Sequence, residues 1–364
     1  MKKTATITWI TYSNFGTYLQ AFALQQFIKS LGYENKILDD SNFIYKKFYW
    51  KYELKKFFLS FSKSYRMYNK YNKLSMKHYK DFKNKFIDLE YNINNVYLNS
   101  QYEIFICGSD QIWRPFLLNR NPNSGFYYAS FSHNKKISYA PSIGVSTIPI
   151  EFYPKYKEYL KDFSFLSLRE EQGIKEIKKI TGKHIEQVVD PTLLLSKEEW
   201  NRLLPQKNIK NNKYVLCYLL TPNIKYITTA RNYAKKHGLI MKMFFNDRTY
   251  YYYSDELICA GPLEFLDAIR NADYIFTDSF HGSIFSAIFE KQFITFKRFT
   301  DNAQSQNSRV ENLLKMFNLP NRLISSNDLD FIEKLQDIDY NTLQKSLNPF
   351  IEHSKQYIIK ALSE

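Results

Sequence analysis

The opening of the chain, residues 5–38, reads ATITWITYSNFGTYLQAFALQQFIKSLGYENKIL and decides the fold class. Residues 5–10 have the apolar and β-branched character of a strand, and residues 17–31 repeat apolar side chains at helical spacing. Gly32 ends that helix, and residues 35–38 form a second strand-like run. A strand, loop, helix and strand in this order predict the first unit of a parallel, doubly wound α/β domain.

The same alternation continues along the chain and indicates two such domains. At about 150 residues a domain, the 364 residues also provide for two hydrophobic cores. We therefore expect an α/β protein with two facing Rossmann-like domains: an N-terminal domain at 1–165, a C-terminal domain at 166–328, and a helical tail at 329–364 that crosses back onto the first domain. The later predicted strands are residues 104–107, 136–140, 165–168, 214–220, 239–245, 274–277 and 293–296. Predicted helices between the last of these strands are residues 262–271 and 282–290.

A basic and aromatic segment interrupts the first domain. Residues 46–85 contain thirteen Lys or Arg against two acids, with Phe, Tyr and Trp between them, and we expect a helical insert over about 43–95. One interpretation is a helix that rests on an anionic membrane surface or holds a phosphorylated carrier, with lysine stems and rings at the interface. The other is an exposed, charged helical hairpin that packs on the domain through its rings.

The composition is that of a globular cytoplasmic protein. Hydrophobic residues make up 44% of the chain, and no run approaches the ~20 apolar residues that span a bilayer. The three cysteines are far apart, which argues against a disulfide framework or a zinc site, and the N-terminus lacks a signal-peptide pattern. We expect membrane contact to be peripheral at most, at the inner face of the cytoplasmic membrane. The net charge of +15 favours anionic partners without selecting among phosphorylated small molecules, lipid carriers, acidic membranes and nucleic acid.

The sharpest candidate site is Thr277-Asp278-Ser279-Phe280-His281-Gly282, where an apolar strand ends and a helix begins. Free N–H groups and the dipole at a helix N-terminus attract anions, so we expect Ser279, His281 and Gly282 to line a pocket for a phosphate or carboxylate. A histidine needs little tuning to act as a general acid or base near neutral pH, which suggests that role for His281. The alternative is a histidine that only caps the helix.

Two more loops follow predicted strand ends in the first domain, where open α/β sheets bind ligands. The first contains Asn14 and Gly16 and weakly resembles a phosphate cradle, without the GxGxxG pattern of dinucleotide sites. The second contains Ser109, Asp110 and Gln111, of which Asp110 also suits a turn cap. We expect these five residues to bind the acceptor or to line the cleft.

Four cations lie near predicted strand ends and are candidates for donor binding: Arg169, Lys297, Arg298 and Arg309. Arg169 either holds a phosphate or carboxylate or forms a structural pair with a neighbouring glutamate. No metal-binding motif is present, and we interpret Asp39-Asp40 as a solvated turn rather than a metal or ribose site. We expect neither a metal nor a cofactor.

Five short motifs in order resemble the polysaccharide pyruvyl transferase family over roughly residues 5–320. The motifs are Asn14-x-Gly16 with Leu19-Gln20-Ala21, Gly108-Ser109-Asp110-Gln111-x-Trp113, Ser167-Leu168-Arg169-Glu170, Asp190-Pro191-Thr192 and Ser279-Phe280-His281-Gly282. The resemblance implies two facing Rossmann-like domains like those of GT-B glycosyltransferases, with the acceptor on the first and the donor on the second. It also implies that His281 is the catalytic histidine and that Lys297 or Arg298 is a donor-binding cation.

The resemblance further implies phosphoenolpyruvate as the donor co-substrate and a lipid-linked or polymeric saccharide as the acceptor, in the biosynthesis of a cell-surface polysaccharide. Nucleic acid is not an expected partner. The turn Pro141-Ser142-Ile143-Gly144 lacks the arginine that follows a similar turn in ketal-forming members. Two alternatives therefore stay open: a GT-B-like glycosyltransferase that uses a sugar nucleotide, and a non-catalytic protein that binds anions or membranes.

Overall fold

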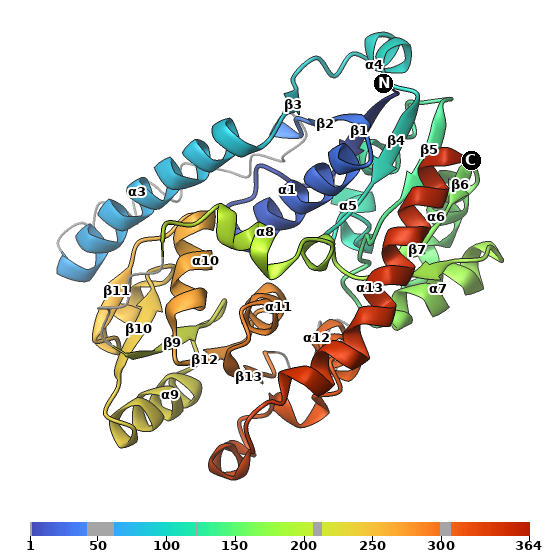
Figure 1. The fold of residues 1–364 in the computed structure, drawn as a ribbon. Helices are drawn as coiled ribbons and strands as arrows, with labels where there is room; N and C mark the ends of the chain where they lie inside the picture. Colours follow the sequence, from blue (N-terminus) through green and yellow to red (C-terminus); the bar gives the residue numbers. More distant parts are fainter. Residues whose placement is uncertain (1, 42–61, 121–122, 207–212, 299–306) are drawn as a thin grey trace.

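Two parallel six-stranded sheets, each with the Rossmann strand order, form the frame of the molecule (Figure 1). The computed structural model describes residues 2–41, 62–120, 123–206, 213–298 and 307–364. The first sheet has the order β3-β2-β1-β4-β5-β6 and the second the order β11-β10-β9-β12-β13-β14. All strands in each sheet are parallel, and it is the order of the strands that turns back at β1 or β9, because the chain fills one side of that strand first and then the other. Ligands bind at such switch points in the strand order. The predicted fold class, two facing Rossmann-like domains, is confirmed.

The strands of the first sheet are β1 (Lys3–Ile7), β2 (Glu34–Leu38), β3 (Leu89–Glu90), β4 (Ile104–Cys107), β5 (Lys135–Ser138) and β6 (Phe163–Phe165). Those of the second are β9 (Tyr214–Tyr218), β10 (Ile240–Phe244), β11 (Glu256–Ile258), β12 (Tyr274–Thr277), β13 (Gln292–Phe296) and β14 (Leu323–Ile324). A separate pair, β7 (Ser167–Leu168) and β8 (Glu186–Gln187), lies between them in sequence. The predicted division near residue 165 thus falls between the last strand of one sheet and the first strand of the other.

Helices cover both sheets. In the first half they are α1 (Phe15–Ser30), α3 (Lys63–Phe86), α4 (Asn95–Gln101), α5 (Pro115–Arg120), α6 (Tyr153–Leu160), α7 (Glu171–Thr181) and α8 (Lys197–Arg202). In the second they are α9 (Ile224–Lys236), α10 (Pro262–Asn271), α11 (Phe280–Ile288), α12 (Asn307–Met316) and α13 (Tyr340–Ser363). No helix in the described ranges has the length and hydrophobicity needed to cross a membrane.

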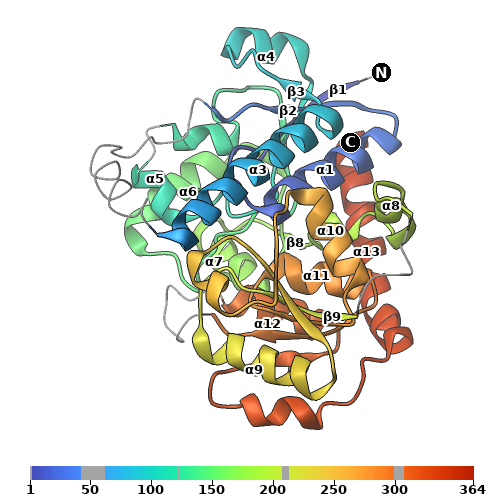
Figure 2. The same ribbon diagram turned by 90° about the vertical axis from the view of Figure 1, so that its left-hand side faces the viewer.

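The two domains share one hydrophobic cluster. It joins α1 side chains such as Phe22 to Trp200 of α8 and Phe285 of α11, and the ring centroids of Phe22 and Trp200 lie 5.7 Å apart. The C-terminal helix α13 lies beside β5 and β6 of the first sheet (Figure 1), and the Tyr357 hydroxyl donates to the Ser138 carbonyl at 2.9 Å. Figure 2 shows α13 and α6 on opposite sides of the molecule. This shared packing joins the two domains through α1, α8, α11 and α13.

The described part of the basic insert is the long helix α3, which packs on both domains through its rings. Tyr79 stacks on Phe15 of α1 at 5.7 Å, while Tyr71 contacts Phe245 of the second domain at 5.3 Å. These rings face the protein, as in the hairpin interpretation. The insert also ends earlier than the predicted residue 95, because Leu89–Glu90 already pairs with β2. Residues 42–61 lie outside the described ranges.

The carboxylates after β2 are buried, contrary to the solvated turn expected for Asp39-Asp40. Asp40 is 1% exposed and accepts hydrogen bonds from the Thr11 hydroxyl at 2.7 Å and the Tyr127 hydroxyl at 3.1 Å. Burial raises the pKa of Asp40 to about 6, although the two hydroxyl donors oppose the increase. The sequence-based interpretation was wrong because the hydroxyls that donate to this carboxylate, those of Thr11 and Tyr127, belong to segments far from it in sequence.

This raised pKa predicts a pH dependence of stability. The folded pKa of Asp40, about 6, exceeds the ~3.9 of an unfolded aspartate, so the stabilisation is fully present below pH ~4 and is lost as the pH rises through 6. We expect Asp40→Asn to remove up to about 3 kcal/mol of this dependence. Urea unfolding between pH 4.5 and 7.5 measures it, with the exposed Asp81→Asn as control. Equal pH slopes in the parent and Asp40→Asn would contradict the prediction.

Candidate active site

His281 lies where the second sheet meets the first domain. The strand β12 ends at Thr277, and the Ser279 hydroxyl caps α11 by accepting the N–H of Gly282 at 3.2 Å. The helix begins at Phe280, two residues before the predicted start, so His281 occupies its first turn rather than the preceding loop. The imidazole is 7% exposed. A histidine held in this way is buried at a helix N-terminus, where the dipole favours negative charge.

The imidazole of His281 rests directly on Gly16, the second residue of α1. A Cβ atom at position 16 would lie 1.9 Å from Nδ1 of His281, so only glycine permits this approach. The N-termini of α1 and α11, one from each domain, therefore face each other across the histidine. The N–H groups of the first turn point out of each helix. Both helices therefore direct N–H groups and the positive ends of their dipoles toward the same region.

We predict that Gly16→Ala lowers turnover by at least tenfold without unfolding the protein. Alanine is a better helix former than glycine by up to about 1 kcal/mol, but its methyl group must displace the imidazole. Steady-state kinetics and a thermal melt separate the two effects. The matched control is Gly173→Ala in α7, where the new Cβ would lie 2.9 Å from the far end of the Leu168 side chain, 3.4 Å from Cγ of Glu170 and 3.6 Å from Cγ1 of Ile143, and no imidazole is displaced. Parental turnover in Gly16→Ala would show that the position of the imidazole is not critical.

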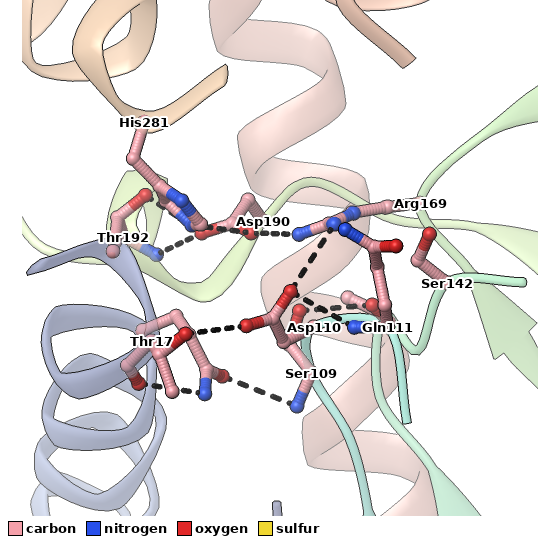
Figure 3. Close-up of polar contacts among 12 residues, drawn as sticks. Thr17, Ser109, Asp110, Gln111, Ser142, Arg169, Asp190, Thr192 and His281 are labelled. Atoms are coloured by element: carbon pink, nitrogen blue, oxygen red, sulfur yellow. Dashed lines mark hydrogen bonds and ion pairs between the residues drawn. The ribbon is translucent and has the colours of Figure 1, made fainter. Parts of the chain in front are cut away.

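Asp190 holds the other edge of the imidazole. Its Oδ2 lies 3.5 Å from Nε2 of His281 and 2.7 Å from Nη1 of Arg169, and its Oδ1 accepts the Thr192 hydroxyl at 2.7 Å (Figure 3). Burial alone would raise the pKa of Asp190, but the charges of His281 and Arg169 hold it well below its usual range. The carboxylate is therefore ionised at neutral pH and can stabilise a protonated imidazole.

A chain of polar contacts extends this pair into the first domain. Arg169 lies with Nη2 3.8 Å from Oδ1 of Asp110, and Oδ2 of Asp110 accepts the Thr17 hydroxyl at 2.7 Å (Figure 3). Arg169 also has Nε 3.5 Å from Glu170 and is 3% exposed. Its guanidinium is thus surrounded by three carboxylates. The predicted structural pair with Glu170 exists, but the shorter contact is with Asp190.

Arg309 and Arg169 share one aromatic ring. The guanidinium carbons lie 4.5 Å (Arg169) and 5.9 Å (Arg309) from the centroid of Phe280, and all three side chains line one narrow cavity with Asp190. Burial and the charge of Arg169 lower the pKa of Arg309 to about 9, so it remains protonated at neutral pH. Arg169 already has three carboxylates beside it, so Arg309 is the candidate donor-binding cation of this cavity by its position.

The other predicted donor residues have structural partners. Gly282 packs against the Thr277 side chain, and Lys297 lies at the end of β13 with Nζ 3.6 Å from Glu311. Arg298 lies close enough to Asp278 to oppose the effect of burial, which raises the pKa of that carboxyl to about 6. Gly282 and Arg298 therefore lie near Thr277 and Asp278, just before α11. Arg169, by contrast, contacts Asp190 directly.

The predicted cleft residues of the first domain have different partners. Asn14 caps α1 by accepting the N–H of Gly16 at 3.0 Å, and Asp110 joins the Arg169 chain. Ser109, which we expected to line the cleft, is fully buried and donates its hydroxyl to the Ala140 carbonyl at 2.9 Å. Gln111 approaches Gly144, at which an added Cβ would lie 2.4 Å from its Oε1. Ser109 is therefore a structural residue of the loop.

Asp190 and Thr17 were not among the predicted site residues. The Asp190-Pro191-Thr192 motif was visible in the sequence, but no local pattern showed that its carboxylate reaches Arg169 and His281. Thr17 had no signal, because its partner Asp110 is 93 residues away. Within the described ranges, no group of three His, Cys, Asp or Glu side chains is placed to hold a metal ion.

Comparisons with known proteins identify the family and the fold. The family model described as polysaccharide pyruvyl transferase matches residues 14–298. Among solved structures, the UDP-GlcNAc 2-epimerase of Methanocaldococcus jannaschii bound to UDP-GlcNAc and UDP has a TM-score of 0.52 at 11% identity, covering 100% of this chain and 99% of that chain. Staphylococcus aureus MnaA with UDP also has a TM-score of 0.52 at 11% identity, over 98% and 97%. No curated protein gives a significant match. At such identity the likeness shows the fold alone, which is the GT-B arrangement.

Proposed function

The chain belongs to the polysaccharide pyruvyl transferase family, and is a transferase, and we propose that it moves a pyruvyl group from phosphoenolpyruvate to a sugar of a cell-surface polysaccharide or its lipid-linked precursor. The observation that carries the proposal is the His281–Asp190 pair beside two buried or half-buried arginines. A proton donor next to an anion site is what transfer from an enol phosphate requires.

The proposed reaction assigns a role to each group. His281, held by Asp190, gives a proton to the methylene carbon of phosphoenolpyruvate, and the adjacent carbon becomes oxocarbenium-like. A sugar hydroxyl attacks that carbon and loses its proton, the carbon–oxygen bond to phosphate breaks, and inorganic phosphate leaves. A second hydroxyl of the same sugar then closes the ketal. Arg309 and the N-terminus of α11 stabilise the negative charge of the donor and of the leaving phosphate.

An in vitro assay tests the donor and the reaction together. The protein is incubated with phosphoenolpyruvate and a panel of lipid-linked and soluble saccharides, and phosphate release and acceptor mass are followed. We expect one phosphate released for each acceptor that gains the mass of a pyruvyl ketal. No phosphate release and no mass gain with any acceptor would contradict the proposal, and transfer from a sugar nucleotide instead would identify a glycosyltransferase.

A further inference from the structure

A second cavity lies between α3 and the carboxyl ends of β9, β10 and β11. Its volume is about 190 Å³, and it contains no catalytic side chain described above. One wall is Asn14 and Phe15, the residues directly before Gly16. Another is Tyr218, whose ring would lie 3.1 Å from a Cβ on Gly282. The cavity wall therefore adjoins Gly16 in sequence and Gly282 in space, and these two glycines belong to the first turns of α1 and α11.

The chemistry of the cavity wall is aromatic and neutral. The rings that line it are Phe15, Tyr68, Tyr71, Tyr79, Tyr218, Phe244 and Phe245. Between them lie amides and hydroxyls, including Asn14, Asn72 and Asn246. The residues described along its wall include no Lys, Arg, His, Asp or Glu. Among these described residues a phosphate or carboxylate would find no counter-charge, in contrast to the cavity that Arg169 and Arg309 line.

Several polar groups at the wall are available to a ligand. Asn14 uses its carbonyl oxygen to cap α1, and its amide N–H₂ has no partner among the described residues. Asn246 donates to the Leu219 carbonyl at 3.1 Å, which leaves its own carbonyl oxygen as an acceptor. The side chain of Asn72 is exposed and makes no hydrogen bond within the described ranges. Rings with a few donors and acceptors between them suit a neutral ligand with an apolar face and polar edges.

We propose that this cavity binds one pyranose ring of the saccharide acceptor, and that α3 of the insert is its outer wall. A pyranose presents C–H groups that lie on the negative faces of aromatic rings, and its hydroxyls match the amides of Asn14, Asn72 and Asn246. The volume of about 190 Å³ is many times the ~10–15 Å³ that a cavity needs to hold one water, so a single ring has room. This inference rests on the proposed function, and it gives the insert a role in acceptor recognition.

A chemical probe in the wall allows binding to be measured without any reaction. Cys259 lines the cavity and is partly exposed, whereas Cys107 and Cys217 are fully buried. Alkylation by iodoacetamide at pH 9, followed by mass spectrometry, therefore reports on Cys259. We expect saturating methyl hexopyranosides to slow this alkylation at least fivefold, and phosphoenolpyruvate and UMP to leave it unchanged. The proposal would be overturned if UMP protected Cys259 from alkylation and no pyranoside did. It would also be overturned if none of these ligands protected Cys259.

Two variants and a matched control connect the protection to the cavity. Asn72→Ala removes one neutral hydrogen bond and should weaken pyranoside binding about three- to tenfold. Tyr71→Ala removes a ring and should weaken it at least tenfold. Asn69→Ala, on the same helix but outside the cavity, should bind as the parent does. If Tyr71→Ala loses its thermal transition, the exposed Asn72→Ala still decides the question, because unchanged protection in that variant would contradict the proposal.

Kinetics separate this inference from the proposed function. With an active acceptor, both cavity variants should raise the acceptor KM by those factors and leave the donor KM unchanged. Pyruvyl transfer with a parental acceptor KM in both variants would overturn the cavity assignment while the function stands. Pyranoside protection that depends on Tyr71 and Asn72, without transfer from phosphoenolpyruvate, would leave the cavity standing and overturn the donor.

Discussion

Replacement of His281 by alanine is expected to lower kcat by about 10²–10⁴-fold, the usual contribution of a general acid or base. The imidazole is the only candidate proton donor that touches both helix N-termini described above, through Gly16 and through its own place in α11. Its Nε2 also lies 3.5 Å from Oδ2 of Asp190. The measurement is steady-state turnover with donor and acceptor saturating, together with a thermal melt of the variant.

Two controls distinguish proton transfer from anion binding at His281. His281→Asn retains a hydrogen-bond donor in the first turn of α11 but cannot transfer a proton near neutral pH, so we expect it to be as inactive as the alanine variant. Calorimetry with phosphoenolpyruvate shows whether the donor still binds. Lost turnover with retained binding identifies a proton-transfer residue, whereas lost binding alone identifies a phosphate ligand. Near-parental activity in both variants would leave His281 as a structural residue only.

Removal of the Asp190 carboxylate is expected to have the second-largest effect. In Asp190→Ala, Arg169 loses its shortest ion pair at 2.7 Å, and breaking a buried pair typically costs about 3–5 kcal/mol. Glu170 and Asp110 remain 3.5 Å and 3.8 Å from the guanidinium, so we expect the lower end of that range, about 3 kcal/mol. Urea unfolding at pH 7 measures the loss. An unchanged midpoint would show that Arg169 needs only its other two partners.

Asp190→Asn separates the catalytic part of this effect from the structural part. The amide keeps the volume of the side chain and an oxygen that can accept from Arg169 or Thr192, but it no longer carries the negative charge opposite His281. We expect stability to fall by less than in Asp190→Ala and kcat to fall at least 100-fold, with donor binding retained. Asp88→Asn, at an exposed carboxylate of the first domain, is the control. Parental kcat in Asp190→Asn would remove Asp190 from the catalytic argument.

Several elements were predictable because their signals are local. Strands 104–107 and 274–277 were predicted with the bounds that the structure shows, since both are short apolar runs buried in a parallel sheet. The helix at 262–271 was also predicted correctly, with Pro262 at its first position and an apolar face. The start of α11 was placed two residues late, although Ser279 is the kind of residue that caps a helix. That error put His281 in a loop rather than in a buried first turn.

The sequence by itself determined the doubly wound architecture, the family motifs and His281 as the central candidate, because a strand end followed by a helix start is visible within six residues. Only the tertiary structure decided how these residues work together. Gly16 meets His281 across 265 positions of sequence, and Asp190 reaches Arg169 and His281 on two different elements. Burial strengthens the electrostatic interactions at these contacts. It depends on the packing of both domains, and the pattern of residues along the chain does not reveal it.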